Sequence, residues 1–141
     1  MLQRKQTLWL LLALACAVLT LKFSFFSGLQ PSPTPGQGPT PRYLTASGNI
    51  ILLILTVALI VTTLIDIFNY KNRKLQLRLT ILLIIVSLGN ICLFYLETLK
   101  FVQGTYSLSA VLALAVPVLL ILAAGGIYRD QKLIKSADRL R

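Results

Sequence analysis

The sequence has few charged residues, and very few of these are acidic. Charged residues make up 13% of the 141 positions, whereas a soluble domain carries about 25%. Four acidic residues stand against fourteen Lys and Arg, which gives a net charge of +10. Such a charge is also typical of nucleic-acid-binding proteins, but these gather their basic residues on one polar surface. Here the basic residues are spread between long uncharged stretches, so we expect no nucleic-acid partner.

Residues suited to catalysis or metal binding are equally scarce. The chain has no histidine, and its two cysteines, Cys16 and Cys92, form no CxxC motif. The motifs HExxH and GxSxG and the phosphate-binding glycine loop do not occur. The four acidic residues are too far apart to suggest an acid–base pair. We therefore expect no enzymatic activity and no cofactor, and we assign no catalytic, cofactor-binding or metal-binding residue.

Apolar residues are abundant, at 56% of the chain, and they form four long runs. A helix needs about 20 mostly apolar residues to cross a hydrocarbon core of about 30 Å. The stretches without any charge are 8–21, 43–65, 79–96 and 101–128. From these we predict four transmembrane helices, near residues 8–27, 49–68, 79–98 and 107–127.

The pattern inside the runs predicts the fold. Leu, Ile, Val and Ala follow one another with no polar stripe at helical spacing, and a helix that is apolar all round is surrounded by lipid or by other helices. Segments that cross a bilayer are helices or closed barrels, and the alternating pattern of a barrel strand does not occur. The sequence thus predicts an all-α integral membrane protein. Its single domain, residues 1–141, would be an antiparallel four-helix transmembrane bundle.

The distribution of positive charge predicts the orientation, because Lys and Arg accumulate in cytoplasmic segments. Two lie at the amino end, four in 69–78 and five in the tail 128–141, against three in the other connections. We therefore expect both termini in the cytoplasm, with the basic segments on the anionic headgroups of the inner leaflet. Apolar residues at helical spacing in the tail predict an amphipathic extension of the fourth helix, acting as a topology anchor or a protein-docking handle. They are Leu133, Ile134, Ala137 and Leu140.

The remaining connections differ in composition. Segment 28–48 holds five of the six prolines, which predicts an extended, mobile loop, either a plain linker or a ligand for an aromatic groove. Segment 99–106 is expected to be a tight turn. The first run also has features of a cleaved signal peptide. Its apolar residues continue well past Cys16, however, so we expect the mature chain to begin at or next to Met1.

Two charged residues lie within or near the apolar runs. Lys22 is expected to extend its ammonium group to the outer headgroups, or alternatively to pair with Glu97. Asp66 lies one turn inside the cytoplasmic end of the second helix, where a carboxylate costs a few kcal/mol to insert. We favour a structural ion pair for Asp66, with proton or cation coupling as the alternative. Its candidate partners are Lys71, Arg73 and Arg129.

Asn90 and Pro117 are the other unusual residues of the runs. Asn90 lies midway along the third run and is expected to hydrogen-bond between helices, which contributes roughly 0.5–2 kcal/mol. Its alternative role is a polar point on a permeation path. Pro117 is expected to kink the fourth helix, since it frees the carbonyl of Ala113. The candidate partners of Asn90 are Thr56, Thr62 and Ser87.

Three polar segments resemble those of a known family. They are MLQRKQT at the start, YKNRKLQ at 70–76 and DQKLIKSADRLR at the end. The chain is similar along its whole length to a domain-of-unknown-function family of small four-span membrane proteins of the Bacteroidota. The resemblance implies an inner-membrane location and carries over no activity.

These observations favour a structural or accessory role in a membrane assembly, with a membrane-protein partner or further copies of the chain. A small oligomeric transporter or channel subunit is the alternative, with Asn90, Asp66 and Pro117 near its path. A bundle interior that is dry and apolar would favour the first role. A polar cavity joining Asn90 and Asp66 would favour the second.

Overall fold

The computed structural model describes residues 2–32, 38–70 and 72–138, and within these the side chains of 6–32, 38–70 and 72–133. Most of this chain is helical, with one small antiparallel sheet. The helices are α1 (Leu2–Lys22), α2 (Ile50–Phe68), α3 (Arg73–Thr98) and α4 (Ala110–Asp138). The strands are β1 (Phe26–Gln30), β2 (Thr40–Leu44) and β3 (Gln103–Tyr106), and the short 3-10 helix η1 (Ala46–Gly48) precedes α2.

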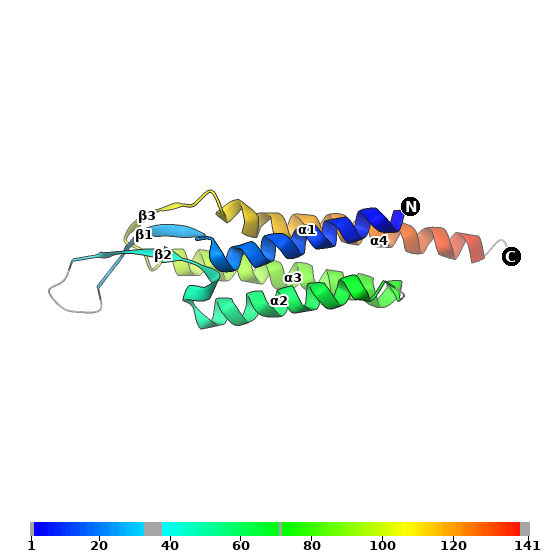
Figure 1. Cartoon of the computed structure of the whole chain (residues 1–141), viewed down its shortest axis with the longest axis horizontal. Helices are drawn as coiled ribbons and strands as arrows, with labels where there is room; N and C mark the ends of the chain where they lie inside the picture. The colour runs from blue at the N-terminus through cyan, green and yellow to red at the C-terminus, as the bar shows by residue number, and fades with distance from the viewer. Residues whose placement is uncertain (1, 33–37, 71, 139–141) are drawn as a thin grey trace.

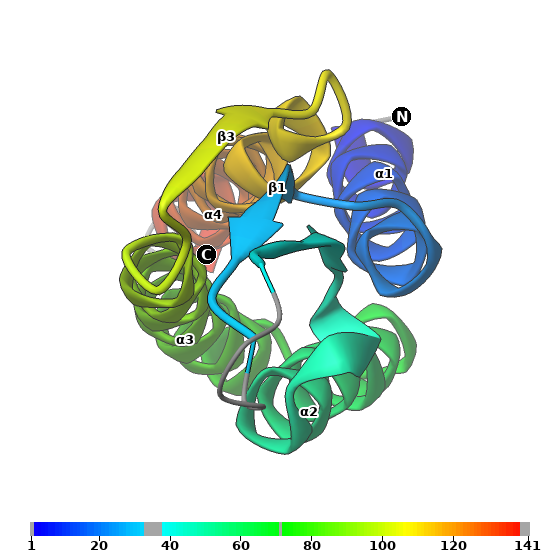
Figure 2. The ribbon, with the colours of Figure 1, turned by 90° about the vertical axis from the view of Figure 1, so that its left-hand side faces the viewer.

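The four helices lie side by side along the long axis of the molecule (Figure 1). Each helix packs against its neighbours in sequence, and α1 packs against α4, which closes the ring seen end-on in Figure 2. The sheet lies at one end of this bundle, which we call the sheet end. Both termini and the α2–α3 turn lie at the other, which we call the termini end. The all-α, antiparallel arrangement expected from the sequence is thus the main body of the molecule.

Length and composition make three of the helices candidates for crossing a membrane. Among the residues that the structure describes, these are Ile50–Phe68, Arg73–Thr98 and Ala110–Leu133. The apolar part of α1, Gln6–Lys22, is shorter. The expected boundaries shift at several helix ends, and α1 begins at Leu2 rather than near residue 8. α1 ends at Lys22 rather than near residue 27, and α3 begins at Arg73 rather than near residue 79, since the basic segment before it is itself helical.

The sheet is the main departure from the expected fold. Its strand order is β2-β1-β3, so the central strand β1 pairs with one strand from each of the two connections at this end. The connection 28–48 is therefore not a plain linker where it forms strands. The connection 99–106 is longer than a tight turn, since it contains β3 and α4 starts only at Ala110. Pro41 fits because it lies on β2, an edge strand, where a residue without an N–H is tolerated.

Aromatic rings pack between the sheet and the helices. Phe25 stacks on Phe94 of α3 with ring centroids 4.6 Å apart, and Phe26 meets Tyr106 edge-on at 5.1 Å. Phe25 N also donates to Leu44 O at 2.7 Å. The residues after Lys22 therefore leave the helix to join the sheet, although three of the next four are phenylalanines.

Each helix turns one narrow stripe toward the bundle axis. In α2 the buried residues recur at alternating steps of four and three, the spacing of helices that pack at a shallow angle. They are Leu52, Thr56, Leu59, Thr63 and Asp66. The same steps recur in α3, with Gln76, Thr80, Leu83, Ser87 and Asn90. The expectation of no polar stripe was wrong, because the polar residues of these helices share the inward-facing stripe.

Candidate functional site

The inward stripes carry a set of buried polar side chains, which we call the polar seam. Each of its members is at most 8% exposed. The seam consists of Gln6, Thr20, Thr56, Thr63, Asp66, Gln76, Thr80, Ser87, Asn90 and Asp130. Several of its hydroxyls donate to a carbonyl of their own helix, as Thr20 does to Ala17 and Thr63 to Leu59, each at 2.7 Å. Hydrogen bonds between two seam members on different helices are fewer, and they fall in two groups.

The first group is a pair in the middle of the bundle. Asn90 Nδ2 donates to Thr56 Oγ1 at 3.2 Å and so links α3 to α2. This confirms the expected hydrogen bond of Asn90 between helices, with Thr56 as its partner. Asn90 Oδ1 is buried without a hydrogen-bond partner. Asn90 lines a small cavity of about 10 Å³. This is close to the smallest volume that can hold one water molecule.

The second group surrounds Asp66 near the termini end. Thr80 Oγ1 lies 2.7 Å from Asp66 Oδ2, and Gln76 Nε2 donates to the main-chain oxygen of Asp66 at 3.3 Å. Thr80 Oγ1 also lies 2.9 Å from Gln76 O. A hydroxyl has one proton to donate, so Thr80 can serve only one of these two acceptors at a time. Asp66 Oδ1 is buried and has no hydrogen-bond partner.

The expected ion pair of Asp66 is not present in the part of the chain that the structure describes. Arg73 instead pairs with Asp130, with Nη1 and Oδ2 3.5 Å apart. Arg129 is exposed, and Lys71 lies outside the described residues. The Arg73–Asp130 pair was missed by the sequence analysis, which placed Asp130 in the tail. The signal that was available is the seven-residue spacing from Ala123 to Asp130, since both lie on the buried stripe of α4.

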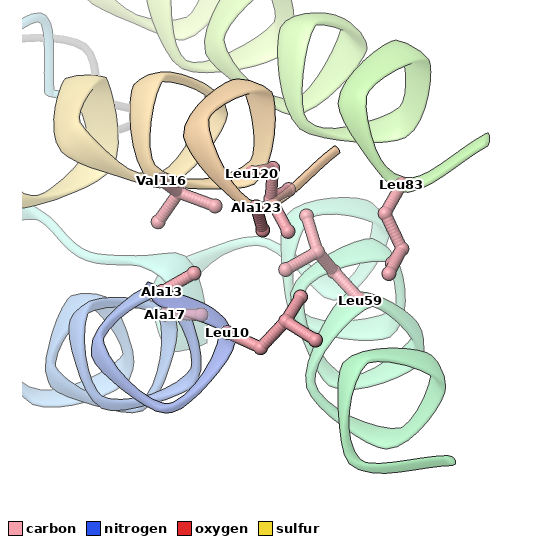
Figure 3. Packing of buried hydrophobic residues seen from close by; sticks show 8 residues of the cluster. All are labelled: Leu10, Ala13, Ala17, Leu59, Leu83, Val116, Leu120 and Ala123. Carbon is pink, nitrogen blue, oxygen red and sulfur yellow. The ribbon is translucent and has the colours of Figure 1, made fainter. Parts of the chain in front are cut away.

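An apolar layer separates the two polar groups. Leu59 lies between Thr56 and Asp66 on α2, and Leu83 lies between Thr80 and Asn90 on α3. Both leucines are at most 2% exposed. They belong to a cluster drawn from all four helices, whose side chains point into the space between them (Figure 3). The cluster is Leu10, Ala13, Ala17, Leu59, Leu83, Val116, Leu120 and Ala123. No described cavity has a lining that includes both Asn90 and Asp66.

The charges at the sheet end form a separate network on the surface. Glu97 Oε1 accepts from Lys100 Nζ at 2.6 Å and from Asn49 Nδ2 at 2.8 Å. Lys22 is the last residue of α1 and is exposed. The alternative pairing of Lys22 with Glu97 is therefore not observed. Pro117 lies buried inside α4, and the kink that the sequence predicts there stays a prediction. The tail is helical as far as Asp138, while the side chains beyond Leu133 lie outside the described part.

The seam can fix the register of the helices and hold isolated waters. It offers little for metal chemistry, since the described residues contain no group of three or more His, Cys, Asp or Glu that could hold an ion. The two cysteines are free and lie on different helices: Cys16 is half-buried on α1 and Cys92 is exposed on α3. What the arrangement defines is a helical bundle with membrane-span-like helices, whose interior combines an apolar cluster with buried polar side chains.

Residues 2–140 match the family described as Domain of unknown function (DUF4293). The chain belongs to this family. No curated protein matches it. No solved structure matches it either.

Proposed function

We propose that this protein is an integral protein of the bacterial inner membrane, with a structural or accessory role in a membrane assembly and no enzymatic activity. In this proposal all four helices cross the bilayer, and both termini and the α2–α3 turn lie in the cytoplasm. The anionic headgroups of the inner leaflet then contact the basic residues at the termini end.

The observation that carries the proposal is the inverted polarity of the bundle. The side chains of the polar seam point inward, while large apolar side chains cover the outside of every helix. Examples that are at least half exposed are Leu8 and Leu11 on α1, Ile54 on α2, Ile85 on α3, and Val118 and Ile121 on α4. In water such a surface far exceeds the patches that soluble monomers expose. In a bilayer it faces lipid tails, and the inward hydrogen bonds avoid unpaired polar groups in hydrocarbon.

The apolar layer favours the accessory role over transport. A permeation path needs polar groups or water along its whole length. Here a layer of leucines, Leu10, Leu59, Leu83 and Leu120, lies between the Asn90 pair and the Asp66 group. The buried hydroxyls next to this layer, Thr63 and Ser87, donate to carbonyls of their own helices. No hydrogen bond joins the Asn90 pair to the Asp66 group within the described residues.

Affinity purification in a mild detergent tests the role. We expect a tagged chain to recover a partner in a fixed ratio, because the large apolar exterior suits contact with other membrane proteins. The same purification from the Thr56→Val variant is the matched control, since that change is buried in the bundle and leaves the exterior unaltered. Recovery of a lone monomer that moves a solute into liposomes would overturn the proposal.

The second candidate is a small oligomeric transporter or channel subunit. It is favoured by two buried acceptors without partners, Asp66 Oδ1 and Asn90 Oδ1. Purified protein in liposomes loaded with a pH-sensitive dye separates the candidates. The accessory role predicts no proton flux above that of empty liposomes. A flux that is lost in Asp66→Asn but kept in Thr62→Val, which alters an outer-facing hydroxyl of the same helix, would establish the second candidate.

A further inference from the structure

A groove runs along the outside of the bundle between α1 and α4, close to the termini end. Its volume is about 290 Å³, and most of its lining is apolar. The residues that line it are Gln6, Trp9, Ile121, Leu122, Gly125, Gly126 and Arg129. Ile121 and Arg129 are eight residues apart on α4, so the groove extends about 12 Å along the helix axis.

Two neighbouring glycines of α4 shape the groove, and only one of them is explained by packing. A Cβ on Gly126 would lie 2.7 Å from Cγ of Gln6, so this glycine lets α1 approach α4 closely. A Cβ on Gly125 would meet nothing within 4 Å. A glycine inside a helix costs about 1 kcal/mol relative to alanine. At Gly125 the missing side chain leaves an open notch on the outer face.

The end of the groove nearest the termini is polar, and its hydrogen-bond donors lack acceptors among the described residues. Gln6 is only 8% exposed, and its Nε2 has no hydrogen-bond partner. Arg129 is exposed at the mouth and forms no ion pair with any side chain that the structure describes. Both groups donate hydrogen bonds, and Arg129 adds a positive charge. The complementary ligand has an apolar chain at one end and an anionic, oxygen-rich group at the other.

From this complementarity we infer that the groove binds a phospholipid with an anionic headgroup. An acyl chain lies in the notch at Gly125 against Trp9 and Leu122, and the headgroup oxygens accept hydrogen bonds from Arg129 and Gln6. The inference rests on the proposed membrane location and adds a specific lipid site to it. Basic pockets between helices at the cytoplasmic boundary are suited to such headgroups.

Trp9 makes the site directly testable, because it is the only tryptophan of the chain and it lines the groove. The full-length protein is reconstituted into vesicles that contain a small fraction of phosphatidylglycerol or phosphatidylcholine with brominated acyl chains, which quench tryptophan fluorescence on contact. We expect the brominated phosphatidylglycerol to quench Trp9 with an apparent affinity about fivefold higher, the contribution of one basic residue at the surface.

Two pairs of variants separate the groove from the bilayer in general. Gly125→Leu fills the notch and should remove the preference for phosphatidylglycerol, whereas Gly89→Leu should keep it. Gly89 is the matched control, since it is also an exposed helical glycine with nothing within 4 Å of its Cβ, but it lies on α3. Arg129→Gln should also abolish the preference, whereas Lys132→Gln, one turn further along α4 and outside the groove, should keep most of it.

The outcomes distinguish the site from the proposed function. Equal quenching of the unaltered protein by the two lipids, or an unchanged preference in both Gly125→Leu and Arg129→Gln, overturns the lipid site and leaves the membrane location standing. If neither lipid quenches Trp9 in protein that resists carbonate extraction, a second copy or another protein covers the groove, and the lipid site is again overturned. Extraction of the protein by carbonate would contradict the membrane location itself.

Discussion

At the scale of the residue, the polar seam shows how a mostly apolar sequence specifies one packing arrangement. Apolar side chains alone give helices little reason to prefer one register in lipid, because lipid tails are as apolar as leucine. Asn90 and Asp66 each have their hydrogen-bond partner on a neighbouring helix, at Thr56 and Thr80. Sliding or rotating α3 against α2 would break both contacts. The polar residues thus select the register, while the apolar residues supply the contact area.

The Asn90–Thr56 contact should contribute measurably to stability. Thr56→Val keeps the shape of the side chain and removes the acceptor of Asn90. We expect a loss of roughly 0.6–2 kcal/mol in the free energy of unfolding, measured by titrating the protein from a mild detergent into dodecyl sulfate. Thr62→Val is the control, since the Thr62 hydroxyl donates to Ala58 O of its own helix. Equal losses in the two variants would contradict a contact between helices.

The hydrogen bond from Thr80 to the Asp66 carboxyl group should contribute to the free energy of unfolding. Among the described side chains, only Thr80 forms a hydrogen bond with this carboxyl group. Thr80→Val should cost about 1–3 kcal/mol, because it leaves a buried charged group without its partner. In the Asp66→Asn background the same change should cost less, since a neutral amide is cheaper to leave unpaired.

A double-mutant cycle of these two changes measures the coupling between Asp66 and Thr80. Thr63→Val is the matched control for Thr80→Val, because the Thr63 hydroxyl is as deeply buried but donates to its own helix. Identical costs of Thr80→Val in the two backgrounds would show that Asp66 and Thr80 do not interact.

The polar seam could have been predicted from the sequence, although the apolar runs did not reveal it. Thr56, Thr63 and Asp66 are seven and three residues apart, the spacing of one helix face. The buried face of a helix is usually identified from the spacing of its apolar residues. In these helices apolar residues occupy every face, so their spacing does not mark the buried one. In a helix that faces lipid the period is carried by the few polar residues. The Asp66–Thr80 contact could not be predicted in the same way, because it depends on how α2 and α3 are rotated against each other.

At the scale of the element, the sheet is the feature that composition concealed. Proline and glycine in 28–48 are typical of an extended linker. An edge strand of five residues that contains a proline shows little of the alternation of apolar and polar residues by which strands are predicted. The pairing of β1 with β3 joins residues more than seventy positions apart. Such a pairing is decided by where the helices bring the two connections, and no local pattern reports it. The helices themselves could be predicted, since each depends on a long local run.

The sheet is closely packed at its centre, which leads to a prediction at Gly28. This glycine pairs with Arg42 on β2 and with Gly104 on β3. A Cβ there would lie 2.8 Å from Gly104 Cα, so Gly28→Ala should push the strands apart at a cost of about 1–3 kcal/mol. We expect trypsin to cut after Arg42 about fivefold faster or more, measured on the protein in mild detergent.

Gly48→Ala is the control for this experiment. Gly48 lies just beyond the sheet, and a Cβ at this position would make only an ordinary contact, 3.5 Å from Thr45 Oγ1. The cleavage rate after Arg42 should stay at the level of the unaltered protein. Resistance of Gly28→Ala to trypsin equal to that of Gly48→Ala would show that the β1–β3 pairing tolerates a side chain there.

At the scale of the whole molecule, the proposed orientation places the sheet end outside the cytoplasm and the termini end inside it. Single cysteines test this in a background in which Cys16 and Cys92 are replaced by alanine. The Ser47→Cys variant should react with a membrane-impermeant maleimide in intact spheroplasts, since Ser47 is exposed near the sheet. The Lys74→Cys variant should react only after lysis, since Lys74 is exposed near the α2–α3 turn. Labelling in the reverse order would contradict the orientation.

The position of β1 at the centre of the sheet also imposes an order on folding during synthesis. Its partner β2 follows after a short connection, but its partner β3 is made only after α2 and α3 have been completed. Until then one edge of β1 has no strand beside it and the ring of helices has no fourth member. The last strand and the last helix emerge together, so the event that finishes the sheet also closes the ring. A chain interrupted before residue 103 would therefore expose both an open strand edge and the polar seam, two features by which quality control can recognise an unfinished membrane protein.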